Sequence, residues 1–86
     1  MKYQHINQGT CSKAVEFEID DQGIVHNVLF YGGCNGNLQG IGKLVEGLSA
    51  SEIIQRLRGI RCNGGPTSCP DQLAQALEEV LKGQKS

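Results

Sequence analysis

The sequence predicts an α+β fold in which a three-stranded antiparallel sheet is followed by three helices packed on one face. Two observations lead to this prediction. Apolar and polar residues alternate along residues 13–20 and, with a more apolar composition, along 24–31, as in half-buried strands. After Gly36 the apolar residues recur at helical spacing instead, in three successive segments. Because the strands all precede the helices, the layout is the segregated α+β class.

The strand region contains one clear hairpin. Residues 13–20 place apolar side chains on one face and acidic ones on the other, and residues 20–23 form a turn that ends in Gly23. We therefore expect 13–20 to pair with 24–31 in a β-hairpin. Residues 3–7 alternate more weakly and predict a short edge strand.

The first helix is expected after Gly36, with an apolar stripe of Leu38, Ile41, Leu44, Val45 and Leu48. Two glycines inside this segment, Gly40 and Gly42, each cost about 1 kcal/mol of helix stability relative to alanine. We interpret them as positions where the helix packs very closely on a strand or loop. Gly47 is a natural stop.

Two further helices have recognisable ends. Ser49 and Glu52 form a capping box at the start of the second helix, and Gly59 is expected to end it. The last helix precedes Gly83 and begins near Pro70. Because the residue before a proline avoids the helical region, we expect Cys69 to be the N-cap and Pro70 the first helical residue.

Length and composition limit the possible functions. The 86 residues form a single domain, 1–86, with a small core. A net charge of −1 and only four aromatic residues give no nucleic-acid-binding signature. The N-terminus lacks an apolar signal region and no apolar run approaches the roughly 20 residues of a membrane helix. We therefore expect a cytoplasmic protein with reduced thiols and no membrane partner.

The four cysteines are the candidate site. Cys11 precedes one strand of the hairpin and Cys34 follows the other, so antiparallel pairing brings both to the same end. Cys69 lies at a helix N-terminus, where backbone N–H groups favour a thiolate, and Cys62 shares its glycine-containing loop. Four thiolates suit a tetrahedral Zn²⁺ ion or an iron–sulfur cluster. Redox-active thiols and inert buried cysteines are the alternatives.

Other chemical motifs are weaker. Residues 36–44 resemble a phosphate-binding loop, but the glycine spacing is one residue too long and no hydroxyl follows the lysine. Arg56, Arg58 and Arg61 could hold an anion, although a solvated helix face is the favoured interpretation. His26 is expected to pack at the edge of the core rather than bind a ligand. The residues indicate no catalytic constellation, and we do not expect this chain to be catalytic alone.

Two stretches resemble a known family. Residues 67–71 spell Thr-Ser-Cys-Pro-Asp, and residues 31–38 read Tyr-Gly-Gly-Cys-Asn-Gly-Asn-Leu. Both are similar to the motifs of the TSCPD domain, and the resemblance covers nearly the whole chain. This domain occurs as a free-standing small protein and as a C-terminal appendage of adenosylcobalamin-dependent ribonucleotide reductases. The resemblance implies an accessory role near deoxyribonucleotide synthesis, with a ribonucleotide reductase as a protein partner.

The order of elements also resembles the U-type iron–sulfur cluster scaffold. In this comparison Cys11, Cys34 and Cys69 correspond to the three scaffold cysteines, whereas Cys62 has no counterpart. Lys13 and Ser68 stand where the scaffold has an aspartate and a histidine.

A fourth cysteine ligand implies a closed, structural site rather than an open scaffold. The favoured hypothesis is therefore a four-cysteine metal module, with Zn²⁺ preferred over an iron–sulfur cluster. An iron–sulfur scaffold or carrier, a thiol redox accessory that uses Cys62 and Cys69, and a structural homodimer are the alternatives.

Overall fold

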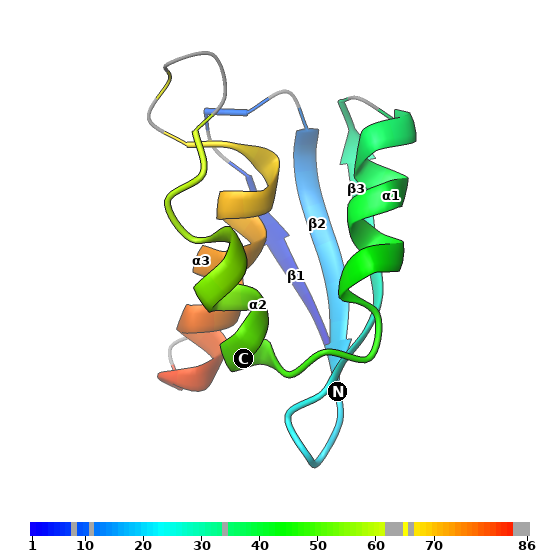
Figure 1. Ribbon diagram of the computed structural model, residues 1–86, viewed down its shortest axis with the longest axis vertical. Helices are drawn as coiled ribbons and strands as arrows, with labels where there is room; N and C mark the ends of the chain where they lie inside the picture. The colour runs from blue at the N-terminus through cyan, green and yellow to red at the C-terminus, as the bar shows by residue number, and fades with distance from the viewer. Residues whose placement is uncertain (8, 11, 34, 62–64, 66, 84–86) are drawn as a thin grey trace.

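The computed structural model describes residues 1–7, 9, 10, 12–33, 35–61, 65 and 67–83. Its elements follow the predicted order, with a sheet first and the helices after it (Figure 1). They are β1 (Lys2–Ile6), β2 (Ser12–Ile19), β3 (Val25–Gly32), α1 (Asn35–Val45), α2 (Ala50–Leu57) and α3 (Cys69–Leu81). The α+β class predicted from the sequence is confirmed.

The sheet is antiparallel throughout, in the order β1-β2-β3. β2 is therefore central, and its Val15 and Phe17 are fully shielded from solvent. The hairpin turn is held by the carboxylate of Asp20, which accepts hydrogen bonds from the backbone N–H groups of Gln22 and Ile24. The alternation of apolar and acidic residues along β2 thus marks its two faces as predicted.

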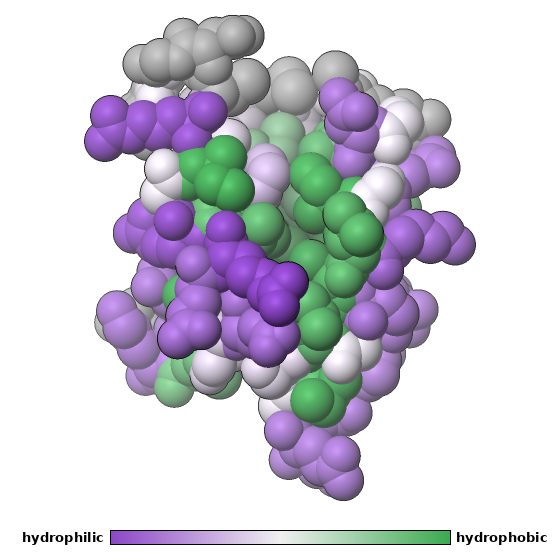
Figure 2. Space-filling view, in the orientation of Figure 1, coloured by the Kyte–Doolittle hydropathy of each residue, from purple (hydrophilic) through white to green (hydrophobic). Residues whose placement is uncertain are grey.

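The helical layer on one face of the sheet has two separate parts. α1 packs along β3, whereas α2 packs against α3 (Figure 1). The core between these parts and the sheet is built from β2, β3 and the inner helix faces, including Val25, Val45, Ile53, Leu73 and Leu77. Figure 2 shows apolar side chains exposed along the line between the two parts.

Two expectations about α1 were wrong. Leu44 was placed in the apolar stripe but is 79% exposed, because Val45 takes the buried position in the last turn. Gly40 was expected to pack closely, yet a Cβ built there would meet nothing within 4 Å. Gly42 does pack as expected, since its Cβ would lie 2.9 Å from the carbonyl oxygen of Val28. One glycine therefore sets how closely α1 approaches β3.

The helix ends agree with the sequence in α2. Ser49 is the N-cap and its side chain accepts a hydrogen bond from the backbone N–H of Glu52. The helix ends before Gly59, which has a positive φ of 91°. No helix within the described ranges is both long enough and apolar enough to cross a membrane.

Candidate functional site

Of the four predicted metal ligands, the structure describes Cys69. Cys11, Cys34 and Cys62 lie outside the described residues. Cys69 is 7% exposed and occupies the first turn of α3. Within the described ranges no group of three or more His, Cys, Asp or Glu side chains could hold a metal ion.

The Cys69 sulfur accepts a hydrogen bond from the hydroxyl of Ser12, with 2.9 Å between Oγ and Sγ. The Ser12 hydroxyl in turn accepts from the side-chain amide of Asn7 at 2.7 Å. This second bond occupies a lone pair of the hydroxyl oxygen, so the serine proton is available for the sulfur. Sequence reasoning missed Ser12, which is 57 residues from Cys69, and Asn7, which contacts Ser12. Such a contact has no local sequence signal.

The segments that precede or follow the other cysteines converge on this same end of the sheet. Ser12, which follows Cys11, pairs across the sheet with Gly32. β3 ends at Gly32 and α1 begins at Asn35, on either side of Cys34. Figure 1 shows the start of β2, the end of β3 and the first turns of α1 and α3 at one end of the molecule. Two helix N-termini, which favour negative charge, therefore lie at this end.

The chain just before Cys62 is fixed to α3 by a short contact. The hydroxyl of Ser68 donates to the backbone carbonyl of Ile60 at 2.6 Å. The same oxygen accepts from the backbone N–H of Asp71, which makes Ser68 the N-cap of α3. The expectation that Cys69 is the N-cap was wrong. The helix begins one residue earlier, because a serine oxygen can satisfy the free N–H and because the restriction before proline is only a bias.

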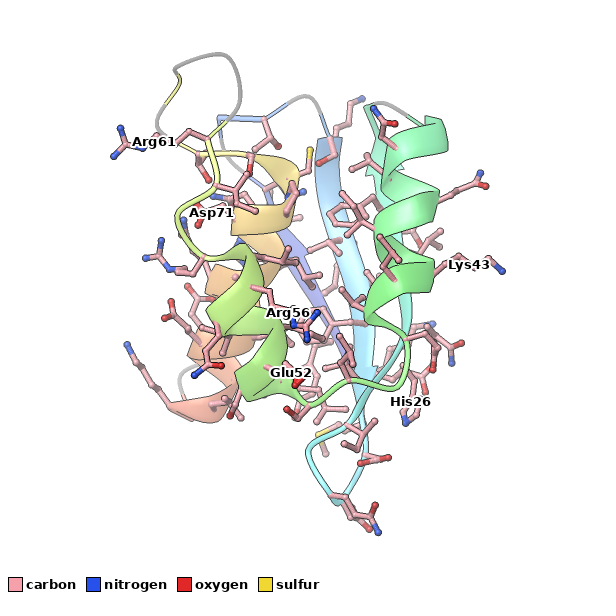
Figure 3. The ribbon with its side chains drawn as sticks, in the orientation of Figure 1. His26, Lys43, Glu52, Arg56, Arg61 and Asp71 are labelled. Atoms are coloured by element: carbon pink, nitrogen blue, oxygen red, sulfur yellow. The ribbon has the colours of Figure 1, made fainter. Side chains whose placement is uncertain are left out.

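Asp71 is the polar centre of the loop and is only 2% exposed. One carboxylate oxygen accepts from the Gly59 N–H at 2.7 Å and from Arg58 at 3.1 Å. The other accepts from the hydroxyl of Thr67 and from the amide of Gln75. Burial alone would raise the pKa of Asp71, but these four hydrogen bonds outweigh it and lower the pKa. Asp71 is therefore a charged anchor for the loop (Figure 3).

Thr67 extends this network toward the sheet. Its hydroxyl accepts from the side-chain amide of Gln72 at 3.1 Å, and the Gln72 carbonyl oxygen lies 3.1 Å from a ring nitrogen of His5. Within the Thr-Ser-Cys-Pro-Asp motif, Thr67, Ser68 and Asp71 thus hold the backbone in place. Cys69 is the predicted metal ligand of the motif, since both carboxylate oxygens of Asp71 already accept hydrogen bonds.

One acceptor at this end of the sheet is unsatisfied. Asn7 is 8% exposed, and its side-chain oxygen is the buried side-chain polar atom without a hydrogen-bond partner in the part of the chain that the structure describes. A buried polar atom in this state costs free energy. The polar network beside Cys69 can therefore take one more hydrogen-bond donor.

Arg58 was assigned to a solvated helix face, and this expectation was wrong. Its guanidinium contacts Asp71 and also Glu78, with 2.8 Å between Nε and the Glu78 carboxylate. Glu78 and Asp71 together raise the pKa of Arg58. Arg56 fits the expectation better, since it is 65% exposed and pairs with Glu52 one turn away on α2.

His26 does not pack at the edge of the core as expected. Its ring lies between the carboxylates of Asp20, at 3.0 Å, and Glu46, at 2.7 Å (Figure 3). Asn27 has a positive φ of 57°, and the register slips between Glu16 and Glu18, so the strand is irregular there. The two carboxylates, Asp20 first, raise the pKa of His26. The His26 ring lowers the pKa of Asp20, whereas the pKa of Glu46 is lowered first by the Asn27 N–H and then by the His26 ring.

One of the comparisons with known proteins, the comparison with family profiles, gives a match. The family profile described as TSCPD domain matches residues 1–81 of the 86-residue chain. No curated protein and no solved structure matches the chain significantly. The profile covers every strand and helix described above. The chain belongs to the TSCPD domain family.

Proposed function

We propose that this chain is a small accessory module that binds a metal through Cys11, Cys34, Cys62 and Cys69. Zn²⁺ is the preferred metal, and an iron–sulfur cluster is the alternative. The observation that carries the proposal is the contact between Ser12 and Cys69, because it joins the start of β2 to the start of α3. Ser12, which follows Cys11 in the chain, thereby contacts Cys69.

Two further contacts support the same grouping. Ser12 pairs with Gly32, two residues before Cys34. Ser68 binds the carbonyl of Ile60, two residues before Cys62. Each predicted ligand is therefore within two residues of a segment anchored at this end. A residue spans at most about 3.3–3.6 Å of extended chain, so these anchors limit how far apart the four cysteines can be.

The surroundings of Cys69 fit a thiolate ligand. The sulfur accepts the Ser12 hydrogen bond at the first turn of a helix, and both features stabilise negative charge. Hydrogen bonds to ligating groups orient the ligand and tune the metal. Ser12 and Asn7 would serve as such supporting residues, while the four sulfurs complete the coordination.

The role is accessory rather than catalytic. The TSCPD domain also occurs at the C-terminus of adenosylcobalamin-dependent ribonucleotide reductases, so a reductase is the proposed class of partner. The module would act by binding a partner or by exchanging its thiols with it.

Metal analysis of the purified protein tests the proposal. Untagged protein prepared without oxygen should contain about one zinc per chain, since four thiolates complete one tetrahedral site. Each Cys→Ser variant should lower the occupancy, whereas Ser51→Ala, on an exposed part of α2, should not. Metal well below one per chain in every preparation, or occupancy indifferent to the cysteine variants, would show that the site does not exist.

The alternatives give different products in the same preparations. An iron–sulfur scaffold predicts a coloured, oxygen-sensitive protein after reconstitution with iron and sulfide, and transfer of the cluster to an apo-acceptor. A redox accessory predicts that mild oxidation removes two titratable thiols, those of Cys62 and Cys69, and that a reductant restores them. Thiols that bind zinc react slowly with the same oxidant.

A further inference from the structure

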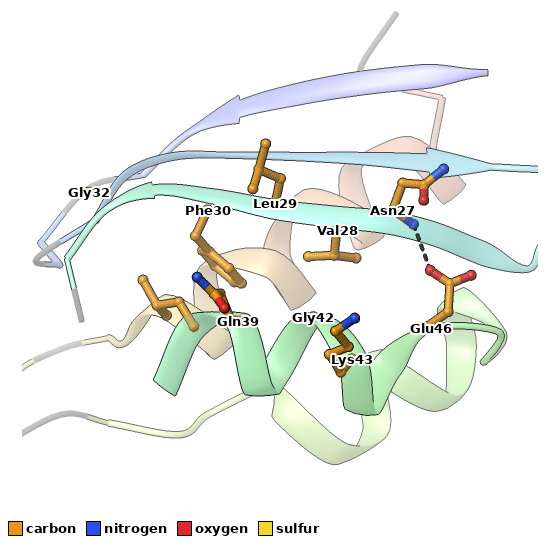
Figure 4. Close-up of a pocket in the computed structure, with 10 residues that line it drawn as sticks. Asn27, Val28, Leu29, Phe30, Gly32, Gln39, Gly42, Lys43 and Glu46 are labelled. Carbon is orange, nitrogen blue, oxygen red and sulfur yellow. Dashed lines mark hydrogen bonds between the residues drawn. The ribbon is translucent and has the colours of Figure 1, made fainter. Parts of the chain in front are cut away.

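A groove of about 400 Å³ runs between β3 and α1, on the side of α1 that faces the sheet edge (Figure 4). Phe30 and Gly32 of β3 line one wall, and Gln39 and Lys43 of α1 line the other. Most of the exposed lining is apolar. The groove has a strand edge on one side and a helix on the other, a shape that can accept an extended chain.

β3 is an edge strand, because the sheet order is β1-β2-β3. Part of its free edge is already occupied. The Asn27 N–H donates to Glu46 at 2.8 Å, and the Val28 carbonyl faces Gly42 of α1. These two contacts cover the first half of the strand. Beyond Val28 the strand edge opens into the groove.

The backbone of Phe30 is the part of that edge available for pairing. In an antiparallel sheet, the N–H and C=O of one residue point to the same side, and the side alternates along the strand. Because the Val28 carbonyl points away from β2 toward α1, the backbone groups of Phe30 point away from β2 as well. No helix or loop group among the described residues hydrogen-bonds to them.

Two charged side chains line the groove, Lys43 and Glu46. The pKa of Glu46 is lowered first by the Asn27 N–H, then by His26, and also by the Lys43 ammonium group. Both Glu46 oxygens already accept hydrogen bonds, one from the Asn27 N–H and the other from His26. None of the ion pairs between described residues includes Lys43. An occupant of the groove would therefore gain from a carboxylate placed beside this ammonium group.

A second copy of the chain fits these requirements poorly. The two edge strands that a copy could offer, Lys2–Ile6 and Val25–Gly32, contain no acidic residue. A symmetric β3–β3 pair would also bring two Lys43 side chains to one interface, where like charges repel. The lack of an acidic residue on either edge strand thus favours a different protein as the occupant.

We propose that this groove binds an extended, acidic segment of a partner protein, which adds a strand to β3 beside Phe30 and places a carboxylate next to Lys43. The proposal does not rest on the metal site, since Cys69, the predicted ligand that the structure describes, is not among the residues that line the groove. It concerns recognition of a partner and not its chemistry. Backbone pairing supplies affinity, and Lys43 supplies the preference for an acidic residue.

The test uses fluorescein-labelled hexapeptides whose residues alternate valine and threonine. One position at a time carries aspartate, asparagine or lysine, and binding to the full chain is followed by fluorescence polarisation. At one position, the peptide with aspartate should bind about two- to fivefold more tightly than the peptide with asparagine, the range expected for one exposed ion pair. Lysine at that position should bind most weakly.

Variants separate this site from general charge effects. Lys43→Glu should reverse the order, so that the lysine peptide binds best. Lys82→Glu, at the end of α3, should leave the order unchanged. Only alternate N–H groups of a bound strand point toward β3. Methylating the nitrogens at odd positions or at even positions should therefore abolish binding in one of the two peptides and not in the other. Hydrogen exchange at the Phe30 amide should slow in the complex.

Several results would overturn the proposal. They are the absence of binding by every peptide, an order unaffected by Lys43→Glu, and equal tolerance of methylation at odd and at even positions. Sedimentation over a dilution series provides a further check. A dimer that dissociates on Lys43→Glu and is displaced by no peptide would assign the groove to a second copy instead.

Discussion

Replacing Asp71 by alanine should strongly destabilise the protein. The carboxylate is buried and accepts four hydrogen bonds, from Gly59, Arg58, Thr67 and Gln75. Removing it leaves these donors without their acceptor, and each neutral donor that stays buried and unpaired costs about 1–3 kcal/mol. A domain of this length has a total stability of about 4–13 kcal/mol, from roughly 0.05–0.15 kcal/mol per residue. Asp71→Ala should therefore remove a large share of it.

The contribution of Arg58 should be smaller. Its side chain is 46% exposed, so water screens its charge and stays available to it when the partner is lost. We expect Arg58→Ala to cost about 1 kcal/mol or less. Asp21→Ala, in the exposed hairpin turn, is the matched control and should change stability by less than about 0.5 kcal/mol.

Urea denaturation followed by circular dichroism at pH 7, with a metal chelator in every sample, measures all three variants. A loss below about 1 kcal/mol for Asp71→Ala would refute the conclusion that this carboxylate anchors the loop. An equal loss for Arg58→Ala and Asp71→Ala would show instead that the ion pair, and not the set of neutral donors, carries the stability.

Three other predictions follow from the contacts. Ser12→Ala should lower metal affinity about 10- to 100-fold, as a competition titration with a chromogenic chelator would show, and unchanged affinity would argue against its supporting role. Gly42→Ala should destabilise the protein by about 1–3 kcal/mol, because its Cβ would meet the Val28 carbonyl at 2.9 Å. Gly40→Ala, where space is open, should be neutral or stabilising in the same thermal unfolding experiment. His26 stabilises the fold through a raised pKa, so its contribution is fully present below its ordinary value of 6.5 and is lost as pH rises through the raised value. The urea midpoint of His26→Gln should therefore fall less than that of the parent chain between about pH 6 and pH 8, and an identical fall would show that another group controls it.

The fold followed from local signals that the structure bears out. The alternation along β2, the turn at Gly23 and the cap at Ser49 are determined by residues close in sequence, and all three are present. Leu44 shows where this reasoning fails. The apolar stripe of a helix covers several residues, and the sequence does not say which residue at its edge becomes exposed when α1 packs mainly on β3.

The site was less accessible to sequence reasoning for a similar reason. Cys69 could be chosen by residue type, but its partner Ser12 could not, because serine is common and the contact is non-local. Arg58 and Asp71 likewise meet across a loop, and nothing in either segment indicates the other. His26 was misjudged because the irregular backbone at Asn27 shifts the strand pairing that its position assumed.

The anchoring of the loop by Asp71 has a consequence for how the module would be loaded. Thr67, Ser68 and Asp71 hold the start of α3 through bonds that involve no sulfur. An ion would then enter a site whose last helix is already formed, so uptake need not wait for folding. On the proposed function, the metal-free chain would already hold α3 in place and would take up an ion by stepwise binding of its thiolates.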